Sequence, residues 1–173
     1  AGRVYLFDDG TWSGDSSSGS AAFATISGSN TSDELGWGIG AGDANGDGDT
    51  DVGVGAPFND DAASDAGAVY GFFSAATLSG DQDAATTAGA TFLGDASSAN
   101  LGQSVLFKDV DDDGIDDLIV AMPNDNSLYS GGGSIAVFAT VTSSSVSATD
   151  ADYRLYGADS GGALGTAMAV AED

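Results

Sequence analysis

An internal repeat restricts what this chain can fold into more than any other property of its sequence. Leu35-Gly36 recurs as Leu101-Gly102 and again, after a nearly equal interval, as Leu164-Gly165. A glycine stands seven residues before each of these pairs, at positions 28, 94 and 157. Because several landmarks hold one period, the chain is predicted to repeat one supersecondary unit whose copies stack on one another.

Each unit is predicted to contain four short strands. Runs of residues rich in Val, Ile, Phe and Tyr are bounded by Gly, Asp, Asn and Ser, which is the usual strand signal. The predicted strands are 35–42, 51–56, 67–73 and 89–94 in one unit, and 101–108, 117–122, 132–138 and 153–157 in the next. Four strands per repeat are typical of a propeller blade. The predicted fold class is therefore all-β, made of β-propeller blades of four antiparallel strands.

The repeat predicts that residues 1–173 are a segment of one propeller. It predicts a partial blade at 1–34, complete blades at 35–100 and 101–163, and a partial blade at 164–173. Residues 1–7 would be a third strand and 164–171 a first strand. The Ser-rich stretches 13–22 and 140–149 fall between third and fourth strands and are expected to be exposed loops. Since propellers close with about 4–8 blades, we expect the partners to be the remaining blades of the same protein or other copies of it.

Composition narrows the chemistry. The chain has 27 Asp and Glu against 3 Lys and Arg, a net charge of −24, and neither His nor Cys. So acidic a chain repels nucleic acid and attracts cations. Without His or Cys there is no disulfide, no thiolate metal site and no imidazole base. No nucleophile elbow is present and no apolar run is long enough to span a bilayer, so we expect no catalysis and no membrane insertion.

In each of the two complete units, one acidic loop follows the first predicted strand. Both fit the pattern D-x-[DN]-x-D-G-x-x-D, and the interval between them equals that between Leu35 and Leu101, so they are in register with the repeat. Calcium takes about six to eight hard oxygen ligands, and alternate residues of a tight loop point inward. Gly48 and Gly114 are expected to let each loop turn sharply after its third ligand. The pattern predicts one Ca²⁺ site in each loop. The predicted ligands are Asp43, Asn45, Asp47, Asp49 (through its backbone carbonyl) and Asp51, and, in the second loop, Asp109, Asp111, Asp113, Ile115 (through its backbone carbonyl) and Asp117.

Two other kinds of loop share part of this pattern. Asp-Gly pairs also close plain hairpins, but here every ligand position matches in both loops. An EF-hand loop starts in the same way and needs a bidentate carboxylate at its twelfth position. That position is occupied by Val54 and Val120. The flanking segment Val52 to Ala56 is also strand-like rather than helical.

At the level of families, the chain resembles the FG-GAP repeat of integrin α-chain propellers and of secreted prokaryotic proteins. The resemblance rests on Leu35-Gly36, the acidic loop, Gly55-Ala56-Pro57 and Gly67-Ala-Val-Tyr70. It departs from the family where Phe-Gly is Leu-Gly, and where the second Gly-Ala-Pro becomes Ala121-Met122-Pro123. The resemblance implies a propeller, usually seven-bladed, with calcium loops on one face.

We therefore expect an extracellular or cell-surface module with a structural, adhesive or assembly role. Its ligand would be a cell-surface protein or a glycan. The alternative is a non-catalytic, carbohydrate-binding appendage of a secreted hydrolase. For that role the aromatic residues that stack on sugars would be Trp12, Trp37, Tyr5 and Tyr70, although most of them are expected in strand cores.

Overall fold

The computed structural model describes residues 1–8, 21–139, 141 and 144–171, and in this part of the chain the fold is all-β. Three sheets are present there, and none of them closes into a barrel. The first sheet has the order β1-β2-β6, the middle sheet β11-β7-β5-β4-β3 and the third sheet β12-β10-β9-β8. The strands are β1 Arg3–Leu6, β2 Ala24–Ser27, β3 Ile39–Gly42, β4 Asp51–Ala56, β5 Ala68–Phe72, β6 Gly80–Asp83, β7 Ala90–Leu93, β8 Val105–Lys108, β9 Asp117–Met122, β10 Ser134–Phe138, β11 Ser145–Ser147 and β12 Tyr153–Tyr156.

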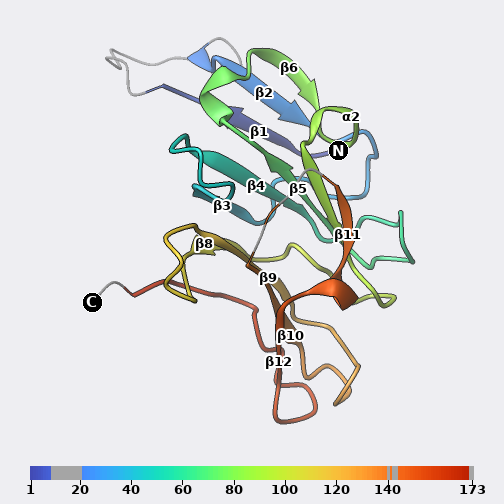
Figure 1. Cartoon of the computed structure of the whole chain (residues 1–173). Helices are drawn as coiled ribbons and strands as arrows, with labels where there is room; N and C mark the ends of the chain where they lie inside the picture. Colours follow the sequence, from blue (N-terminus) through green and yellow to red (C-terminus); the bar gives the residue numbers. More distant parts are fainter. Residues whose placement is uncertain (9–20, 140, 142–143, 172–173) are drawn as a thin grey trace.

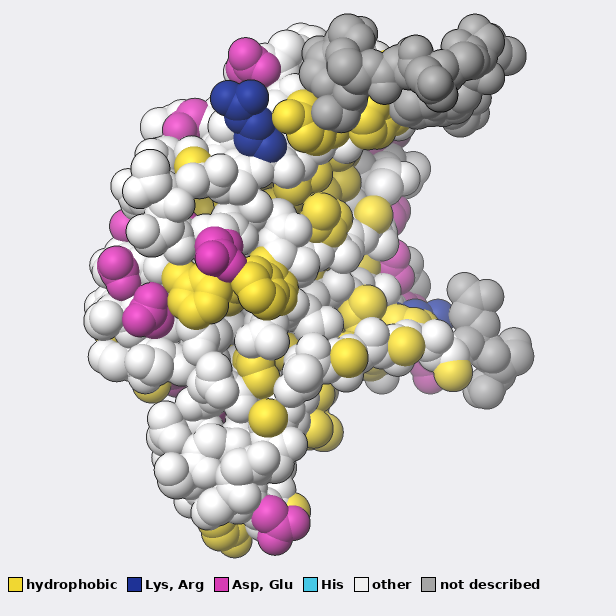
Figure 2. Space-filling view, turned by 180° about the vertical axis from the view of Figure 1, so that it is seen from behind, with side chains coloured by type: hydrophobic (Ala, Val, Ile, Leu, Met, Phe, Trp, Pro, Cys, Tyr) yellow, Lys and Arg dark blue, Asp and Glu magenta, His cyan; other side chains and the backbone are white. Residues whose placement is uncertain are grey.

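The three sheets are stacked as layers, with the middle sheet between the other two (Figure 1). Short helical turns lie in the connections: η1 Ala75–Thr77, α2 Ala84–Thr87 and η2 Ala148–Asp150. The view from behind shows acidic side chains scattered over the surface, with apolar side chains between them (Figure 2).

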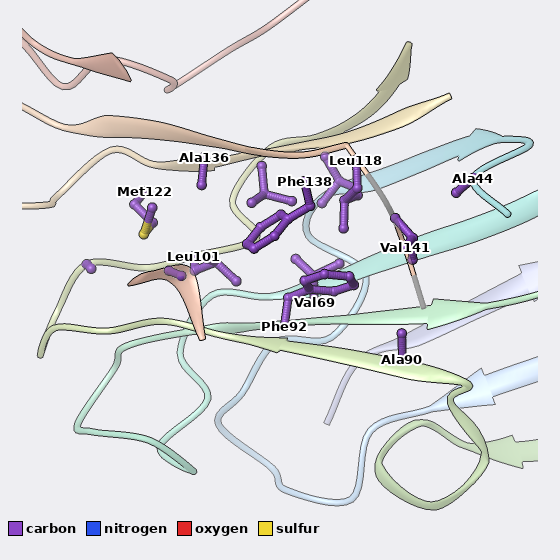
Figure 3. Close-up of a cluster of buried hydrophobic side chains, with 14 residues drawn as sticks. Ala44, Val69, Ala90, Phe92, Leu101, Leu118, Met122, Ala136, Phe138 and Val141 are labelled. Atoms are coloured by element: carbon purple, nitrogen blue, oxygen red, sulfur yellow. The ribbon is translucent and has the colours of Figure 1, made fainter. Parts of the chain in front are cut away.

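Each gap between neighbouring sheets holds its own hydrophobic core. Val54, Phe72 and Ile26 belong to the core between the first and middle sheets. Phe92 and Phe138 meet in the core between the middle and third sheets, with ring centroids 4.7 Å apart (Figure 3). Burying aromatic side chains contributes strongly to stability, so the sheets are held together mainly by this face-to-face packing.

Strand β4 shows why the sheets approach so closely. Its sequence alternates valine with glycine, and successive side chains point to opposite faces of a sheet. Val52 and Val54 belong to the core toward the first sheet. A Cβ atom built at Gly55 on the other face would collide with the carbonyl oxygen of Gly102. Because glycine has no side chain, the third sheet can lie directly against this face of β4.

The predicted strands of the two complete units are confirmed in place and order, and each unit is an antiparallel meander. The two first strands begin four residues later than predicted, at Ile39 and Val105. Gly36 and Gly102 have φ values of 92° and 94°, which interrupt an extended strand at each Leu-Gly pair. The strand predicted at 164–171 is wrong, because these residues form only one isolated bridge, between Leu164 and Gly133.

Two strands that the sequence did not predict join neighbouring units. β6 pairs with β2, and β11 pairs with β7, both in parallel. In each case the connection between a third and a fourth strand reaches back to the fourth strand of the preceding sheet. The prediction of an exposed loop at 140–149 is therefore wrong for β11 and η2. Residues 140 and 142–143, and most of the stretch 13–22, lie outside the described residues.

Candidate metal centre

The two acidic loops join the first and second strands of the middle and third sheets. The first loop, residues 43–51, follows β3, and the second loop, residues 109–117, follows β8. Strands β3 and β8 pack against each other. A Cβ atom at Gly46 would lie 3.0 Å from Cδ1 of Ile115. The stacking of the sheets therefore places the two loops side by side.

The first loop folds around the carboxylate of its opening residue. Asp43 Oδ1 accepts hydrogen bonds from the backbone N–H groups of Gly46 (2.9 Å) and Asp47 (3.1 Å). Its Oδ2 accepts from the N–H of Gly48 at 2.9 Å. Gly48 has a φ of 87°, which confirms the prediction that glycine lets the chain turn there. These bonds are the local interactions by which Asp favours turns.

The second loop repeats this arrangement. Asp109 Oδ1 accepts from the N–H of Asp113 at 3.2 Å, and its Oδ2 accepts from the N–H of Gly114 at 2.8 Å. Gly114 has a φ of 91°. The N–H of Asp113 is shared with Asp111 Oδ1 at 3.2 Å, and the Asp113 carboxylate accepts from the N–H of Ile115 at 2.8 Å. The two loops thus share one backbone conformation.

The last carboxylate of each loop is buried at the start of the following strand. One oxygen of Asp51 accepts from the N–H of Ala44 (3.0 Å), and one oxygen of Asp117 accepts from the N–H of Val110 (2.7 Å). The other oxygen of Asp51 accepts from the N–H of Ser74 at 2.8 Å. Within the described residues, Oδ1 of Asp117 has no hydrogen-bond partner. The position equivalent to Ser74 in this unit is Thr140, which lies outside the described residues. A cation bound at this loop would satisfy the buried oxygen.

The second loop brings three of its predicted ligands together. Carboxylate oxygens of Asp109, Asp111 and Asp117 lie within 4.8 Å of one another, so these residues could hold a metal ion. Asp113 is not in this group. The first loop has Asn45 where the second has Asp111, and among the described residues no second group of three acidic side chains is as tight. The backbone-carbonyl roles of Asp49 and Ile115 stay predictions.

The electrostatics of the loops follow from burial and local hydrogen bonds. Burial raises the pKa of Asp117, and the nearby carboxylates of Asp111 and Asp109 raise it further. Burial likewise raises the pKa of Asp51. The N–H of Gly114 lowers the pKa of Asp109 by bonding its charged form. The charged form of Asp109 is therefore favoured by its hydrogen bonds, whereas burial disfavours the charged forms of Asp51 and Asp117.

Asp116 is a residue of this centre that the sequence did not single out. Its Oδ2 accepts from the N–H of Asp43 (3.0 Å), and its Oδ1 accepts from the N–H of Asp109 (3.1 Å). Its own N–H donates to the carbonyl oxygen of Asp43 at 3.0 Å. Asp116 therefore joins the opening residues of both loops. The only signal in the sequence is that position 116 is acidic where the first loop has Thr50.

Comparison with protein-family models finds no match to this chain, and no curated protein matches it. The likeness to FG-GAP repeats therefore stays a prediction that rests on the motifs quoted above. A search of the described residues finds no helix of the length and apolar character that crossing a bilayer requires.

Proposed function

We propose that this chain is a calcium-binding segment of an extracellular β-propeller of the FG-GAP type, with a structural, adhesive or assembly role. The observation that carries the proposal is the group formed by Asp109, Asp111 and Asp117. Its buried Asp117 Oδ1 has no partner among the described residues. Without a cation, these carboxylates repel one another at short range. A divalent ion would relieve the repulsion and satisfy the buried oxygen.

Calcium suits the loops better than other common ions. All side-chain donors here are hard oxygens, with no imidazole or thiolate to favour zinc or copper. A loop of carboxylates and backbone carbonyls matches the irregular coordination of calcium, whereas magnesium demands near-ideal octahedral geometry. The shared conformation of the two loops supports a second site in the first loop, with Asn45 as a neutral ligand.

The propeller part of the proposal is supported by the repeated layers. Two successive units each form a four-stranded meander, interrupted only where β6 and β11 pair with the preceding sheet, and the third and fourth strands of another unit precede them. The glycines that close the fourth strands also make one repeated hydrogen bond, from N–H of Gly94 to O of Gly67 and from N–H of Gly157 to O of Gly133, both 2.9 Å. Short sheets repeated in this way are the building blocks of propellers.

Calcium titration of two matched variants tests the proposal. Asp117→Asn removes the charge of the buried ligand and is expected to weaken calcium binding at the second loop at least about tenfold. The control is Asp112→Asn, which removes an equal charge from an exposed residue of the same loop, outside the group of three. Asp112 has a φ of 64°, which Asn tolerates well. Equal affinities for the two variants would refute the ligand assignment.

The melting temperature gives an independent measurement. A ligand that binds only the folded state at 100 times its Kd stabilises that state by about 2.7 kcal/mol. A chelator should therefore lower the melting temperature by several degrees, and added calcium should restore it. A metal-free sample whose melting does not respond to calcium would contradict the proposal.

A glycan-binding role is the second candidate, and an exposed tryptophan packed against a half-buried phenylalanine favours it. The side chain of Trp37 is 55% exposed and meets Phe58 edge to face, with centroids 5.9 Å apart. Tyr70 is buried and cannot stack on a sugar, and Trp12 lies outside the described residues. Screening of Trp37→Ala against the unchanged chain on a glycan array tests this role, because only a Trp37-dependent signal would support it.

A further inference from the structure

The outer face of the third sheet carries apolar side chains at positions that the other two sheets bury. Three pairs of residues stand opposite each other on the third and fourth strands of the successive sheets: Val4 with Ile26, Val69 with Phe92, and Ile135 with Leu155. Ile26 is 0% exposed, Phe92 is 1% exposed and Leu155 is 54% exposed. The first two pairs are covered by the next sheet in the stack. The third pair occupies the same place without such a cover in the described residues.

The Leu-Gly pair marks where the next unit begins to pack on each sheet. Gly36 and Gly102, with φ values of 92° and 94°, approach Val4 and Val69 respectively. Gly165 has a φ of 93°, and a Cβ atom there would lie 3.4 Å from Cγ1 of Ile135.

The isolated bridges repeat as well. Leu101 makes a parallel bridge with Gly67, and Leu164 makes the same bridge with Gly133. The outer face of the third sheet thus already holds the opening turn of another unit.

The edge of β12 lacks a strand that the equivalent edges have. β6 pairs in parallel with β2, and β11 pairs in parallel with β7. Within the described residues no strand pairs with the outer edge of β12, and Tyr153 is 55% exposed there. The equivalent Ala90 of β7 is buried. An open edge is a template for one more strand.

From these three observations we infer that the outer face of the third sheet and the free edge of β12 form a docking surface for one more unit of this same repeat. The inference rests on the proposed repeat architecture and does not require calcium. The incoming unit covers Leu155 with the phenylalanine of its third strand, as Phe138 covers Phe92. It also adds a parallel strand to β12 from the connection between its third and fourth strands.

A chain with a duplicated unit tests the inference. A second copy of residues 101–163 is inserted after residue 163, so that the duplicate supplies Leu101-Gly102, Phe138 and β11 to the surface. Leu155→Asp is then made either in the inner copy or in the outer copy, and also in the original chain. The inner substitution should lower the melting temperature by at least about 5 °C, since burying an unpaired charge is costly and 1 kcal/mol shifts a domain of this size by roughly 2–4 °C. The outer substitution and the one in the original chain should change it by less than about 2 °C.

Three results would overturn the inference: equal effects of the inner and outer substitutions, rapid proteolysis of the duplicated unit back to the original length, or a self-associating original chain that Leu155→Asp makes monomeric. The last result would identify a second copy of this chain as the occupant. Repeating the melts with calcium and with chelator separates this test from the calcium proposal, because the inner–outer contrast should persist in both.

Discussion

The middle unit (35–100) and the third unit (101–163) build the same turn around different buried polar groups. In the middle unit, buried Asn59 follows β4 and donates to Asp33 (3.0 Å) and to the hydroxyl of Tyr70 (3.3 Å). In the third unit, Asp125 stands at the same turn after β9 and pairs with Arg154 at 2.8 Å. The backbone bonds are the same, since the carbonyl oxygens of these two residues accept from Gly67 (3.0 Å) and Gly133 (3.1 Å).

This contrast shows that two units with the same backbone hydrogen bonds at a turn can carry side chains of different charge there. Arg154 lies on β12 and also pairs with Asp95, which follows β7, so this ion pair joins the third unit to the middle unit. The position equivalent to Arg154 on β7 is Thr91, and the turn there carries a neutral amide instead of a carboxylate. Burial works to raise the pKa of Asp125, but hydrogen bonds from Ser127 and Ser134 and the charge of Arg154 outweigh it and lower the pKa. The third unit therefore has an ion pair at this turn, whereas the middle unit has hydrogen bonds donated by a neutral amide.

We expect the largest effect from replacing Arg154, whose guanidinium pairs with Asp125 at the turn of the third unit. Arg154→Met leaves Asp125 buried without its positive partner and should lower the free energy of unfolding by about 3–5 kcal/mol. Thr91→Val, the matched change in the middle unit, should cost less than about 1 kcal/mol. Urea unfolding of both variants checks this. Adding Asp125→Asn to Arg154→Met should recover part of the loss, and no recovery would show that the charge of Asp125 is not the cause.

The middle unit should instead respond to high pH. Burial raises the pKa of Tyr70 to about 12, and the nearby Asp61 and Asp33 add to the shift. Because this folded pKa is above the unfolded value of about 10, Tyr70 contributes stability below pH 10 that is lost as pH rises through about 12. The loss amounts to about 2 kcal/mol. Tyr70→Phe should flatten stability over this range, as measured by urea unfolding between pH 9 and 12. An equally steep decline in the variant would assign it to other groups.

Exchanging one acidic residue between the loops should exchange their calcium affinities. Asp111→Asn gives the second loop the neutral residue that the first loop has at its third position, Asn45. It should weaken binding there about tenfold, since each removed charge lowers the attraction for the ion. Asn45→Asp should strengthen binding at the first loop by a similar factor. Calorimetric titration of both variants measures the change. If neither affinity moves, the third position is not a ligand in either loop.

The smallest expected effect concerns the link between the two loops. Asp116→Asn weakens the acceptor for the N–H groups of Asp43 and Asp109, and should cost about 1 kcal/mol of unfolding free energy. It should also weaken calcium binding modestly at both loops, because both opening residues lose a fixed contact. Asp49→Asn is the control, since it removes one charge from an exposed position of the first loop. A change confined to the second loop would show that Asp116 does not couple the two sites.

The local features of this protein could be predicted from its amino-acid sequence. The period located both meanders, and the acidic pattern predicted turns at Gly48 and Gly114 that the left-handed φ values confirm. Such turns are set by hydrogen bonds over a few residues and by the freedom of glycine. The strand predicted at 51–56 is likewise present as β4, because a short run of valine and glycine bounded by turn-forming residues is a local signal.

The contacts between units, and the groups that make them, became visible only in the folded chain. β6 pairs in parallel with β2, and β11 pairs in parallel with β7. The sequences of β6 and β11 carry no strand signal strong enough to predict these two strands. Arg154 and Asp95 are 59 residues apart, and Asp116 and Asp43 are 73 residues apart. These contacts depend on the distance and rotation between stacked sheets, which no local pattern encodes. The partner of a buried charge is therefore set by the packing of whole layers, whereas the shape of each loop is set by its own residues.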